Sequence, residues 1–310
     1  MTTVRIATRG SALALAQAGG IGRAVTEALG RGAELVPLVT EGDRRKEASL
    51  AKIGGKGLFV KEIEEALLDG RADLAVHSAK DLPAKTHPGL VLAAFPVRAD
   101  ARDALVARAR RTRLAELPQG ARVGTGSARR ASQLRALRPD LEVVPLRGNV
   151  DTRLRKLADR ELDAVLLAAA GLERLGLADL IQERIEPDQL LPAVGQGTLA
   201  LQTRADDPLA AELAALDDAA TRARLEAERA FLVALEGDCN VPLAAYAEID
   251  RERVRLRGLV ASADGGTVAR SEQWAPVAEA HTAGLRAAEE VRAAGGDEIL
   301  AALRAEASGG

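Results

Sequence analysis

The sequence is poor in cysteine and in aromatic residues. It has one cysteine in 310 residues, and Phe, Trp and Tyr together make up 2% of the chain. A single thiol excludes an internal disulfide framework and any metal cluster held by several cysteines, and it suits a reducing compartment. So few aromatic rings argue against the base-stacking surfaces of single-strand nucleic-acid binders. We therefore expect a cytoplasmic protein with no nucleic-acid partner.

Long apolar runs, an excess of one charge and metal-binding spacings are also missing. The longest apolar candidate, AVLLAAAGL from Ala164, is about half of the ~20 residues that span a bilayer. The first residues lack the charged head and apolar core of a secretion signal, so we expect neither signal peptide nor membrane contact. The net charge is −2, which does not attract a polyanion. His77, His87 and His281 have no ligand spacing, and we expect no metal.

What the chain does have is an alternation of short apolar runs and helix-period segments. Strands are predicted at 4–8, 34–40, 74–79 and 90–96, and a second alternating set starts near residue 103. This pattern is typical of α/β domains whose strands are joined by helices. The strand-like TLALQT that follows Gln196 is assigned to the first sheet, so that two chain crossings form a hinge.

The last third of the chain has a different pattern. One long helix begins at Ala219, three segments of period two follow with turn residues between them, and a closing helix is predicted over roughly 277–294. These features indicate a small α+β domain with a three-stranded antiparallel sheet, and no heptad or large apolar stripe predicts a partner, so we expect a monomer. The predicted domains are domain 1 at 1–97 and 197–217, domain 2 at 102–192, and domain 3 at 219–310.

Polar side chains gather where four predicted strands end. The four segments are ATRGS, HSAKDLP, GTGSARR and LRGNVDTR. Ligands bind at such strand ends in open α/β sheets, and helix N-termini, hydroxyls and guanidinium groups all suit carboxylate or phosphate. Each segment alone is better explained by helix capping and solvated arginine. The four together predict an anion-binding cleft.

Two glycine-rich segments fall short of nucleotide-binding motifs. Arg129 stands where a dinucleotide fingerprint needs its third glycine, and Gly57 stands where a Walker loop needs Ser or Thr. We therefore expect no nucleotide cofactor. Lys52 and Lys56 lie in the flexible AKIGGKG, which is either a solvated charged loop or, as we favour, a lid over an anionic ligand.

Asp81 and Cys239 each have two interpretations. Asp81, shortly before Pro83, is either a turn-forming residue or a carboxylate in a cationic cleft that stabilises a developing cation. Cys239 is either a small buried hydrophobic residue or, because Gly237 and Pro242 place it in a loop, an outward-facing nucleophile. The residues alone leave both alternatives open.

The chain closely resembles the porphobilinogen deaminase (hydroxymethylbilane synthase) family over essentially its whole length. The resemblance is carried, in order, by ATRGSALALAQ, GGKGLFVKEIEEALL, HSAKDLP, GTGSARR, LRGNVDTRL, AGLERLGL, LPAVGQG and EGDCNVP. It implies two α/β domains similar to periplasmic binding proteins, a hinge between them and a small third domain. It also implies a transferase of tetrapyrrole and haem biosynthesis that condenses four porphobilinogen molecules with loss of ammonia and releases hydroxymethylbilane.

The resemblance further implies a cofactor, a partner and residue roles. The cofactor is a dipyrromethane bound by thioether to Cys239, the catalytic carboxylate is Asp81, and the product passes to uroporphyrinogen-III synthase. The cofactor's carboxylates are assigned to Ser78, Lys80, Thr125, Ser127, Arg129, Arg130, Arg147 and Arg153. The substrate is assigned to Arg9, Ser11, Gln17, Arg147, Arg153 and Arg174. Lys52 and Lys56 belong to the family's lid and Gln196 to the hinge crossing.

The chain departs from the family pattern at four positions, and a rival function uses the same anion sites. The departures are Ala16, Gly126, Ala128 and Asp238, and none of them removes a charged or nucleophilic group.

A two-lobed receptor for an anionic ligand would share the strand-end sites. Such a receptor needs no thiol at Cys239, and it would carry a signal peptide or a DNA-binding domain, so we favour the enzyme.

Overall fold

A computed structural model describes residues 3–40, 60–83, 86–159, 161–237 and 241–308 of the chain. The chain falls into two compact units. Unit 1 comprises Met1–Ala99 and Gly197–Arg222, and unit 2 comprises Asp100–Gln196 and Ala223–Gly310. Among the described residues, none of the helices combines the length and the apolar character that crossing a bilayer requires.

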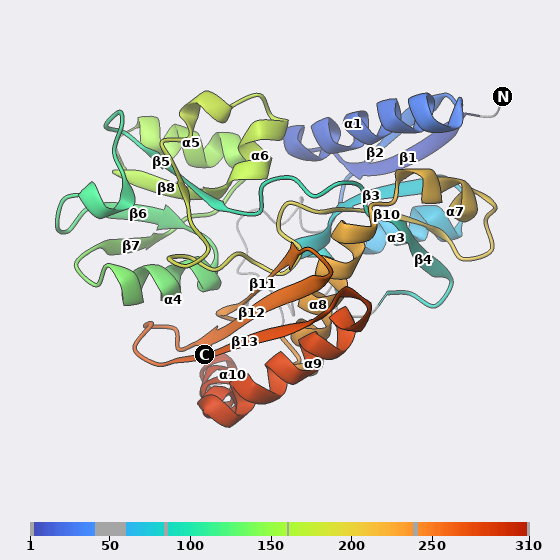
Figure 1. The fold of residues 1–310 in the computed structure, drawn as a ribbon. Coiled ribbons are helices and arrows are strands. Elements are labelled where there is room, and N and C mark those ends of the chain that lie inside the picture. The colour runs from blue at the N-terminus through green and yellow to red at the C-terminus, as the bar shows by residue number, and fades with distance from the viewer. Residues whose placement is uncertain (1–2, 41–59, 84–85, 160, 238–240, 309–310) are drawn as a thin grey trace. The chain divides into compact units, whose positions relative to one another are not determined.

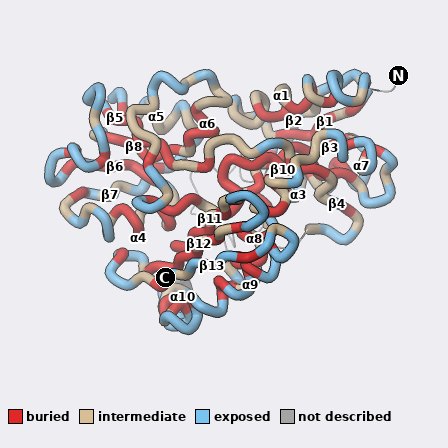
Figure 2. Tube along the Cα trace, viewed as in Figure 1, coloured by how far each residue is buried: buried red, intermediate tan, exposed pale blue. Residues whose placement is uncertain are grey.

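Unit 1 is built on a five-stranded mixed sheet (Figure 1). The strands follow the order β2 (Ala33–Leu38), β1 (Val4–Arg9), β3 (Leu74–Ser78), β10 (Leu199–Arg204) and β4 (Leu90–Ala94). The first three are parallel, and β10 is antiparallel to both of its neighbours. The central strands are buried along nearly their whole length, whereas the edge strand β2 is largely accessible (Figure 2).

Helices cover both faces of this sheet because alternate strand residues are apolar on each side. Ile21 and Val25 of α1 (Ala12–Leu29) pack on one face with the short helix α7 (Leu209–Glu212). Ile63 and Leu67 of α3 (Lys61–Leu68) pack on the other. Local capping defines α1, since the hydroxyl of Ser11 accepts a hydrogen bond at its start and Gly30 ends it in the left-handed conformation.

Unit 2 contains a second five-stranded sheet with an equivalent order. Its strands run β7 (Glu142–Pro145), β6 (Arg122–Thr125), β8 (Ala164–Ala168), β5 (Asp103–Ala107) and β9 (Glu183–Ile185). The helix α4 (Ala128–Leu137) packs on one face, and α5 (Val150–Ala158) and α6 (Ala169–Arg174) pack on the other. In each sheet the antiparallel fourth strand, β10 or β5, directly follows a chain crossing from the other unit.

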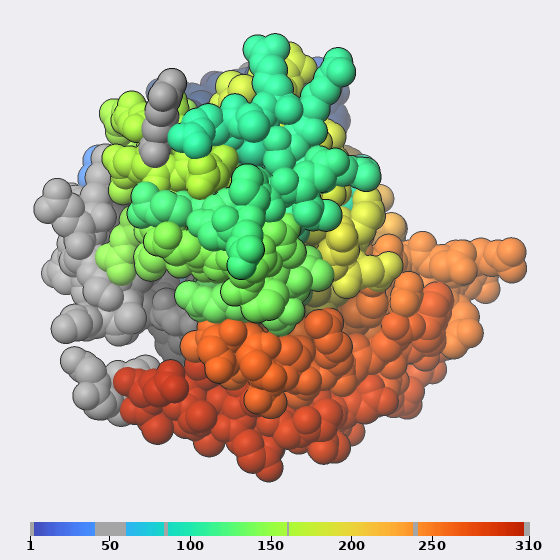
Figure 3. Space-filling view, turned by 90° about the vertical axis from the view of Figure 1, so that its left-hand side faces the viewer, coloured from blue at the N-terminus to red at the C-terminus, as the bar shows by residue number. Residues whose placement is uncertain are grey.

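The C-terminal part of unit 2 is an antiparallel meander covered by helices. Its strands are β11 (Leu243–Asp250), β12 (Arg253–Ala261) and β13 (Val268–Pro276), and its helices are α8 (Ala219–Ala234), α9 (Ala280–Val291) and α10 (Asp297–Ser308). Gly258 faces the core, because a Cβ there would lie 2.4 Å from Phe231 Cε2. The sheet's other face meets Leu191 through Ala244 and Leu259. Figure 3 shows the orange and red residues packed directly against the green ones.

The predicted fold class is confirmed, with differences in detail. TLALQT joins the first sheet as β10, and the last third forms the predicted three-stranded sheet. The three-residue strand β9 is an addition, since ERI is too short to show a period. The closing helix predicted over 277–294 is found as α9, and α10 is an addition that follows Gly295, whose φ of 92° interrupts the helical backbone. The division into three domains stays a prediction.

Candidate active site

Unit 1 gathers six predicted site residues at one edge of its sheet. Strands β1 and β3 are parallel, so their carboxyl ends lie at the same edge. Arg9 ends β1, Ser11 caps α1, and Ser78 ends β3. The buried Gln17 donates from Nε2 to Ser78 Oγ at 3.1 Å, which ties α1 to the end of β3. Lys80 and Asp81 follow in the 3-10 helix Ala79–Asp81.

The 3-10 helix is anchored by its apolar residues. Ala79 and Leu82 are buried, and the Ala79 amide donates to the Thr198 carbonyl at 3.0 Å. Because these two residues face the core, the carboxylate of Asp81 is left exposed and Lys80 is partly exposed. Asp81 therefore stands at the sheet edge as an accessible carboxylate that follows Lys80 in the chain, and its catalytic role stays a prediction.

His77 lies directly behind this edge and stays neutral. It is buried, and its Nε2 lies 2.9 Å from Gln202 Oε1, while Gln202 donates to Glu64 Oε1 at 2.9 Å. Burial lowers the pKa of His77 to about 4, although the hydrogen bond with Gln202 opposes the shift. The imidazole is thus a neutral support for the strand that carries Ser78.

We expect His77 to make folding stability depend on pH between its unfolded and folded pKa values. In the unfolded chain His77 binds a proton below about pH 6.5, whereas in the folded protein it does so only below about pH 4. The free energy of unfolding therefore falls as the pH falls through this window. The limiting slope is about 1.4 kcal/mol per pH unit. Urea unfolding of the wild type and His77→Gln at a series of pH values measures it. The exposed His87→Gln serves as control, and equal slopes in all three proteins would contradict the assignment.

Unit 2 contributes hydroxyls and guanidinium groups at its own strand ends. Thr125 ends β6, and its Oγ1 accepts a hydrogen bond from the Ser127 amide at 3.2 Å. Ser127 caps α4 by accepting from the Arg130 amide. Arg147 is exposed just after β7, and Arg153 lies in α5, where its Nε donates to the Gly148 carbonyl at 2.8 Å.

Asp103 binds the first two arginines of α4. It is fully buried and accepts from Arg129 Nη1 at 2.7 Å and from Arg130 Nε at 2.9 Å. Burial opposes its ionisation, but the two guanidinium groups hold the pKa of Asp103 well below its usual range. Burial lowers the pKa of Arg129, and Asp103 opposes that shift. Sequence reasoning missed Asp103; its one signal is a charged residue opening an otherwise apolar strand, DALVA.

Positive charge exceeds negative charge in this buried cluster. The cluster has three arginines, Arg129, Arg130 and Arg153, and one carboxylate, Asp103. The pKa of Arg153 is lowered to about 10, mainly by burial and also by repulsion from Arg130. Burial also lowers the pKa of Arg174 at the end of α6. Desolvated guanidinium groups attract anions strongly. The donor set of arginines and hydroxyls therefore fits a ligand with several carboxylates, such as a dipyrromethane.

Gln196 lies where the chain crosses between the units. Its Nε2 donates to the Ala101 carbonyl at 2.7 Å and to Asp103 Oδ1 at 2.9 Å, and its Oε1 accepts from Arg130 Nη2 at 3.4 Å. On the unit 1 side, the Ala99 amide donates to the Gly197 carbonyl at 3.2 Å. The two crossing segments thus run side by side, and Gln196 links them to the arginine cluster.

A buried glutamate, also missed from the sequence, joins α8 to this crossing. Glu228 is fully buried; its Oε2 accepts from the Gly195 amide at 2.7 Å and its Oε1 from the Ala247 amide at 2.8 Å. It connects the segment before Gln196 to strand β11. Within ATRARLEAERAFLVALEG the residue resembles any solvated helix glutamate, so only the fold reveals its place.

Cys239, Lys52 and Lys56 lie outside the described residues, but the approach to the cysteine is described. The Gly237 amide donates to the Leu232 carbonyl at 3.0 Å, which closes the C-terminal turn of α8. Glu236 occupies the left-handed position of this turn with a φ of 52°. A Cβ at Gly237 would lie 2.8 Å from Leu243 Cδ1 and 2.9 Å from Leu232 Cδ1.

We expect opposite effects from two neighbouring substitutions in this turn. Gly237→Ala should lower the free energy of unfolding by about 1–3 kcal/mol, because the added methyl group overpacks Leu243 and Leu232. Glu236→Gly should be neutral or raise it by about 1 kcal/mol, since glycine relieves the left-handed backbone. Denaturant unfolding of both variants tests the pair, and a stable Gly237→Ala variant would contradict the packing.

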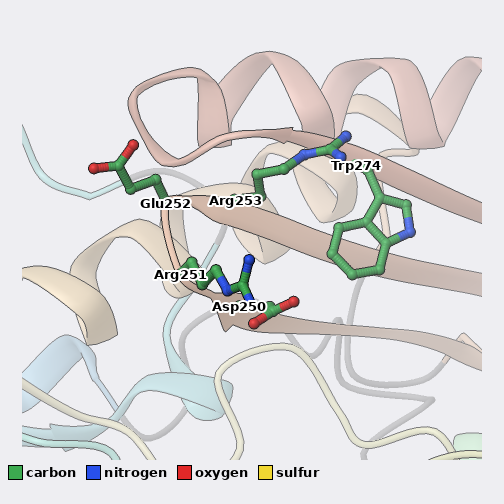
Figure 4. A pocket seen from close by; sticks show the side chains of 5 residues that line it. All are labelled: Asp250, Arg251, Glu252, Arg253 and Trp274. Atoms are coloured by element: carbon green, nitrogen blue, oxygen red, sulfur yellow. The ribbon is translucent and has the colours of Figure 1, made fainter.

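A hollow on the meander is lined by other residues. It measures about 810 Å³ and is lined by Asp250, Arg251, Glu252, Arg253 and Trp274 (Figure 4). The guanidinium of Arg253 lies 5.4 Å from the centre of the Trp274 ring, and Glu252 points away from both. Two acids and two arginines balance each other here, so this hollow lacks the excess of positive charge found around Arg130.

Comparison with known proteins gives consistent matches over nearly the whole chain. The family described as "Porphobilinogen deaminase, dipyromethane cofactor binding domain" matches residues 4–212, and "Porphobilinogen deaminase, C-terminal domain" matches residues 223–293. Porphobilinogen deaminase of Syntrophotalea carbinolica is 51% identical over 304 residues, which cover 97% of this chain and 96% of that protein. Porphobilinogen deaminase of Roseiflexus sp. is 52% identical over 301 residues, 96% and 99% of the two chains. A solved periplasmic substrate-binding protein from Coxiella burnetii has a TM-score of 0.43 at 15% identity, covering 69% of this chain and 91% of its own.

Proposed function

The chain belongs to the porphobilinogen deaminase family, and on this basis we propose that it acts as a hydroxymethylbilane synthase. It condenses four porphobilinogen molecules head to tail with loss of ammonia and releases hydroxymethylbilane by hydrolysis. The observation that carries the proposal is the pair of strand-end clusters, each built from the residues that the family motifs assign to cofactor and substrate. When bound, dipyrromethane supplies the free pyrrole α-carbon on which the chain grows.

The arginines and hydroxyls hold carboxylates. Each porphobilinogen ring carries an acetate and a propionate, so every addition brings two more negative charges into the site. Bidentate guanidinium groups suit these carboxylates, and helix N-termini add backbone donors. We assign the cofactor's carboxylates to Ser78, Lys80, Thr125, Ser127, Arg129, Arg130, Arg147 and Arg153. The incoming ring is assigned to Arg9, Ser11, Gln17, Arg174, and again Arg147 and Arg153.

Asp81 stabilises positive charge on the reacting pyrrole. When ammonia leaves the aminomethyl group of porphobilinogen, positive charge spreads onto the ring nitrogen. The exposed carboxylate of Asp81 accepts the N–H of that ring and offsets the charge. The nucleophile is a pyrrole carbon, so the protein contributes orientation and electrostatics.

The family also supports assignments for residues outside the described part and for the protein's context. Cys239 carries the cofactor by thioether, and Lys52 and Lys56 belong to the lid. Gln196 acts at the hinge between domain 1 (1–97 and 197–217) and domain 2 (102–192), and domain 3 (219–310) presents the cysteine. The protein works as a cytoplasmic monomer and hands its product to uroporphyrinogen-III synthase.

Product and ammonia analysis tests the proposed function directly. Purified holoprotein incubated with porphobilinogen should release one ammonia for each porphobilinogen consumed and one hydroxymethylbilane for every four. The receptor alternative predicts saturable binding of porphobilinogen with no ammonia released. That second outcome would refute the enzyme assignment, because ammonia loss is inseparable from the condensation.

A further inference from the structure

Arg184 joins two elements of unit 2 that are distant in the sequence. It lies in β9, where it pairs with Ala104 of β5. Its Nη2 donates to Glu173 Oε1 at 2.7 Å, and its Nε lies 3.3 Å from Asp100 Oδ2. Glu173 belongs to the last turn of α6, and Asp100 is the first residue of unit 2 on the crossing segment. One guanidinium therefore bridges the crossing segment and α6.

The Asp100 end of the bridge is itself held in place. Its Oδ1 accepts from the Arg102 amide at 2.9 Å, and its Oδ2 accepts from Arg102 Nη2 at 2.8 Å. Arg102 Nη1 also donates to Glu186 Oε1 at 2.6 Å. Burial opposes ionisation, but the hydrogen bonds from Arg102 hold the pKa of Asp100 below its usual value. Asp100 is thus a fixed anion to which Arg184 can bind.

Helix α6, at the other end of the bridge, depends on tertiary contacts for its stability. The helix has six residues, and a helix this short is not stable in isolation. Its last residue is Arg174, which directly follows Glu173 and is half-buried, so that burial lowers its pKa. A desolvated guanidinium binds a carboxylate well when it is already oriented. Arg174 shares the last turn of α6 with Glu173, which Arg184 contacts.

We propose that Arg184 is a positioning residue for substrate binding: by bridging Glu173 to Asp100 it fixes the turn of α6 that presents Arg174 to a carboxylate of the incoming ring. The substrate's identity rests on the function proposed above. Arg184 does not touch the reacting atoms. Its effect is on the binding of substrate and transition state alike, so it acts on KM more than on kcat.

Steady-state kinetics of holoprotein variants test the proposal. Arg184→Met should raise KM for porphobilinogen about three- to tenfold and leave kcat within about twofold. Glu173→Gln should raise KM similarly, and the double variant should resemble either single one, because both remove the same bridge. Arg184→Lys should lie between wild type and Arg184→Met, since one ammonium cannot bind both carboxylates in the same way.

Arg138→Met provides the matched control. Arg138 is half-buried like Arg184, and it donates hydrogen bonds to Asp140 and to the carbonyls of Leu114 and Leu117. It lies at the end of α4, away from α6. It should lower stability and leave KM unchanged. A KM rise in Arg138→Met equal to that in Arg184→Met would overturn the proposal, because the effect would then be general destabilisation. A wild-type KM in Arg184→Met would overturn it as well.

Amide hydrogen exchange separates this inference from the proposed function. Without substrate, Arg184→Met should speed exchange in residues 169–177 and leave exchange in α4 at 128–137 at the wild-type rate. This readout does not require turnover. If the wild type releases no ammonia from porphobilinogen, the proposed function fails while the exchange result still decides whether the bridge holds α6. Unchanged exchange at 169–177 refutes the bridge even in an active enzyme.

Discussion

Asp81→Asn should lower turnover of porphobilinogen about 100- to 1,000-fold while the folded structure is retained. The amide keeps the size and shape of the carboxylate but removes the negative charge that offsets the positive charge on the pyrrole nitrogen. Asp81 is exposed, and its 3-10 helix is anchored by Ala79 and Leu82, so the substitution leaves the packing unchanged. Ammonia release under single-turnover conditions, together with thermal unfolding, measures both effects.

Asp206→Asn is the matched control for this experiment. Asp206 is also an exposed aspartate of unit 1, and it lies after β10, in none of the family motifs. It should retain wild-type activity. Activity within about threefold of wild type in Asp81→Asn would refute the assigned role, because removal of a preorganised charge at a reacting centre costs far more than that.

Cys239→Ser should abolish product formation by removing the attachment point of the cofactor. A serine hydroxyl is a much poorer nucleophile than a thiolate, so it does not form the corresponding bond. Intact-protein mass spectrometry should show an excess mass of two linked pyrroles on the wild type and none on the variant. Turnover by a wild-type preparation that carries no such excess would refute the assignment.

Asp81→Asn serves as the control for the cysteine variant, because the two residues have separate roles. Asp81→Asn should keep the excess mass on Cys239 while losing turnover, whereas Cys239→Ser should lose both. Loss of the excess mass in both variants would mean that Asp81 acts in cofactor assembly as well as in elongation.

Local sequence patterns were sufficient to predict much of the fold. Short apolar runs predicted the strands of both α/β sheets except β9, and period-two segments predicted the C-terminal meander. TLALQT was correctly assigned to the first sheet. Helix capping was the alternative interpretation of the segments that contain Ser11 and Ser127, and both residues do cap helices. The predicted closing helix ended just before Gly295, where the backbone does break, but the helix α10 beyond this glycine was not predicted.

The partners of buried charges could not be predicted in the same way. Arg129 and Arg130 were expected to bind cofactor carboxylates, and the structure places Asp103, 26 and 27 residues earlier in the chain, against both of them. Glu228 bonds the Gly195 amide 33 residues away and the Ala247 amide 19 residues away. A charged residue at the start of a strand or within a helix has no local pattern that indicates burial or names its partner.

The sequence by itself predicted which residues along the chain carry the chemistry: the hydroxyls and arginines at the strand ends, Asp81 and the solitary Cys239. Helix caps, turns and strand periods depend on residues that are neighbours in the sequence, so they can be predicted without the tertiary structure. Only the tertiary structure decided which charges share a site. Asp103 with Arg130, and Arg184 with Glu173 and Asp100, come together through sheet order and chain crossings. These pairs matter for stability because a buried charge without an oppositely charged partner is energetically costly.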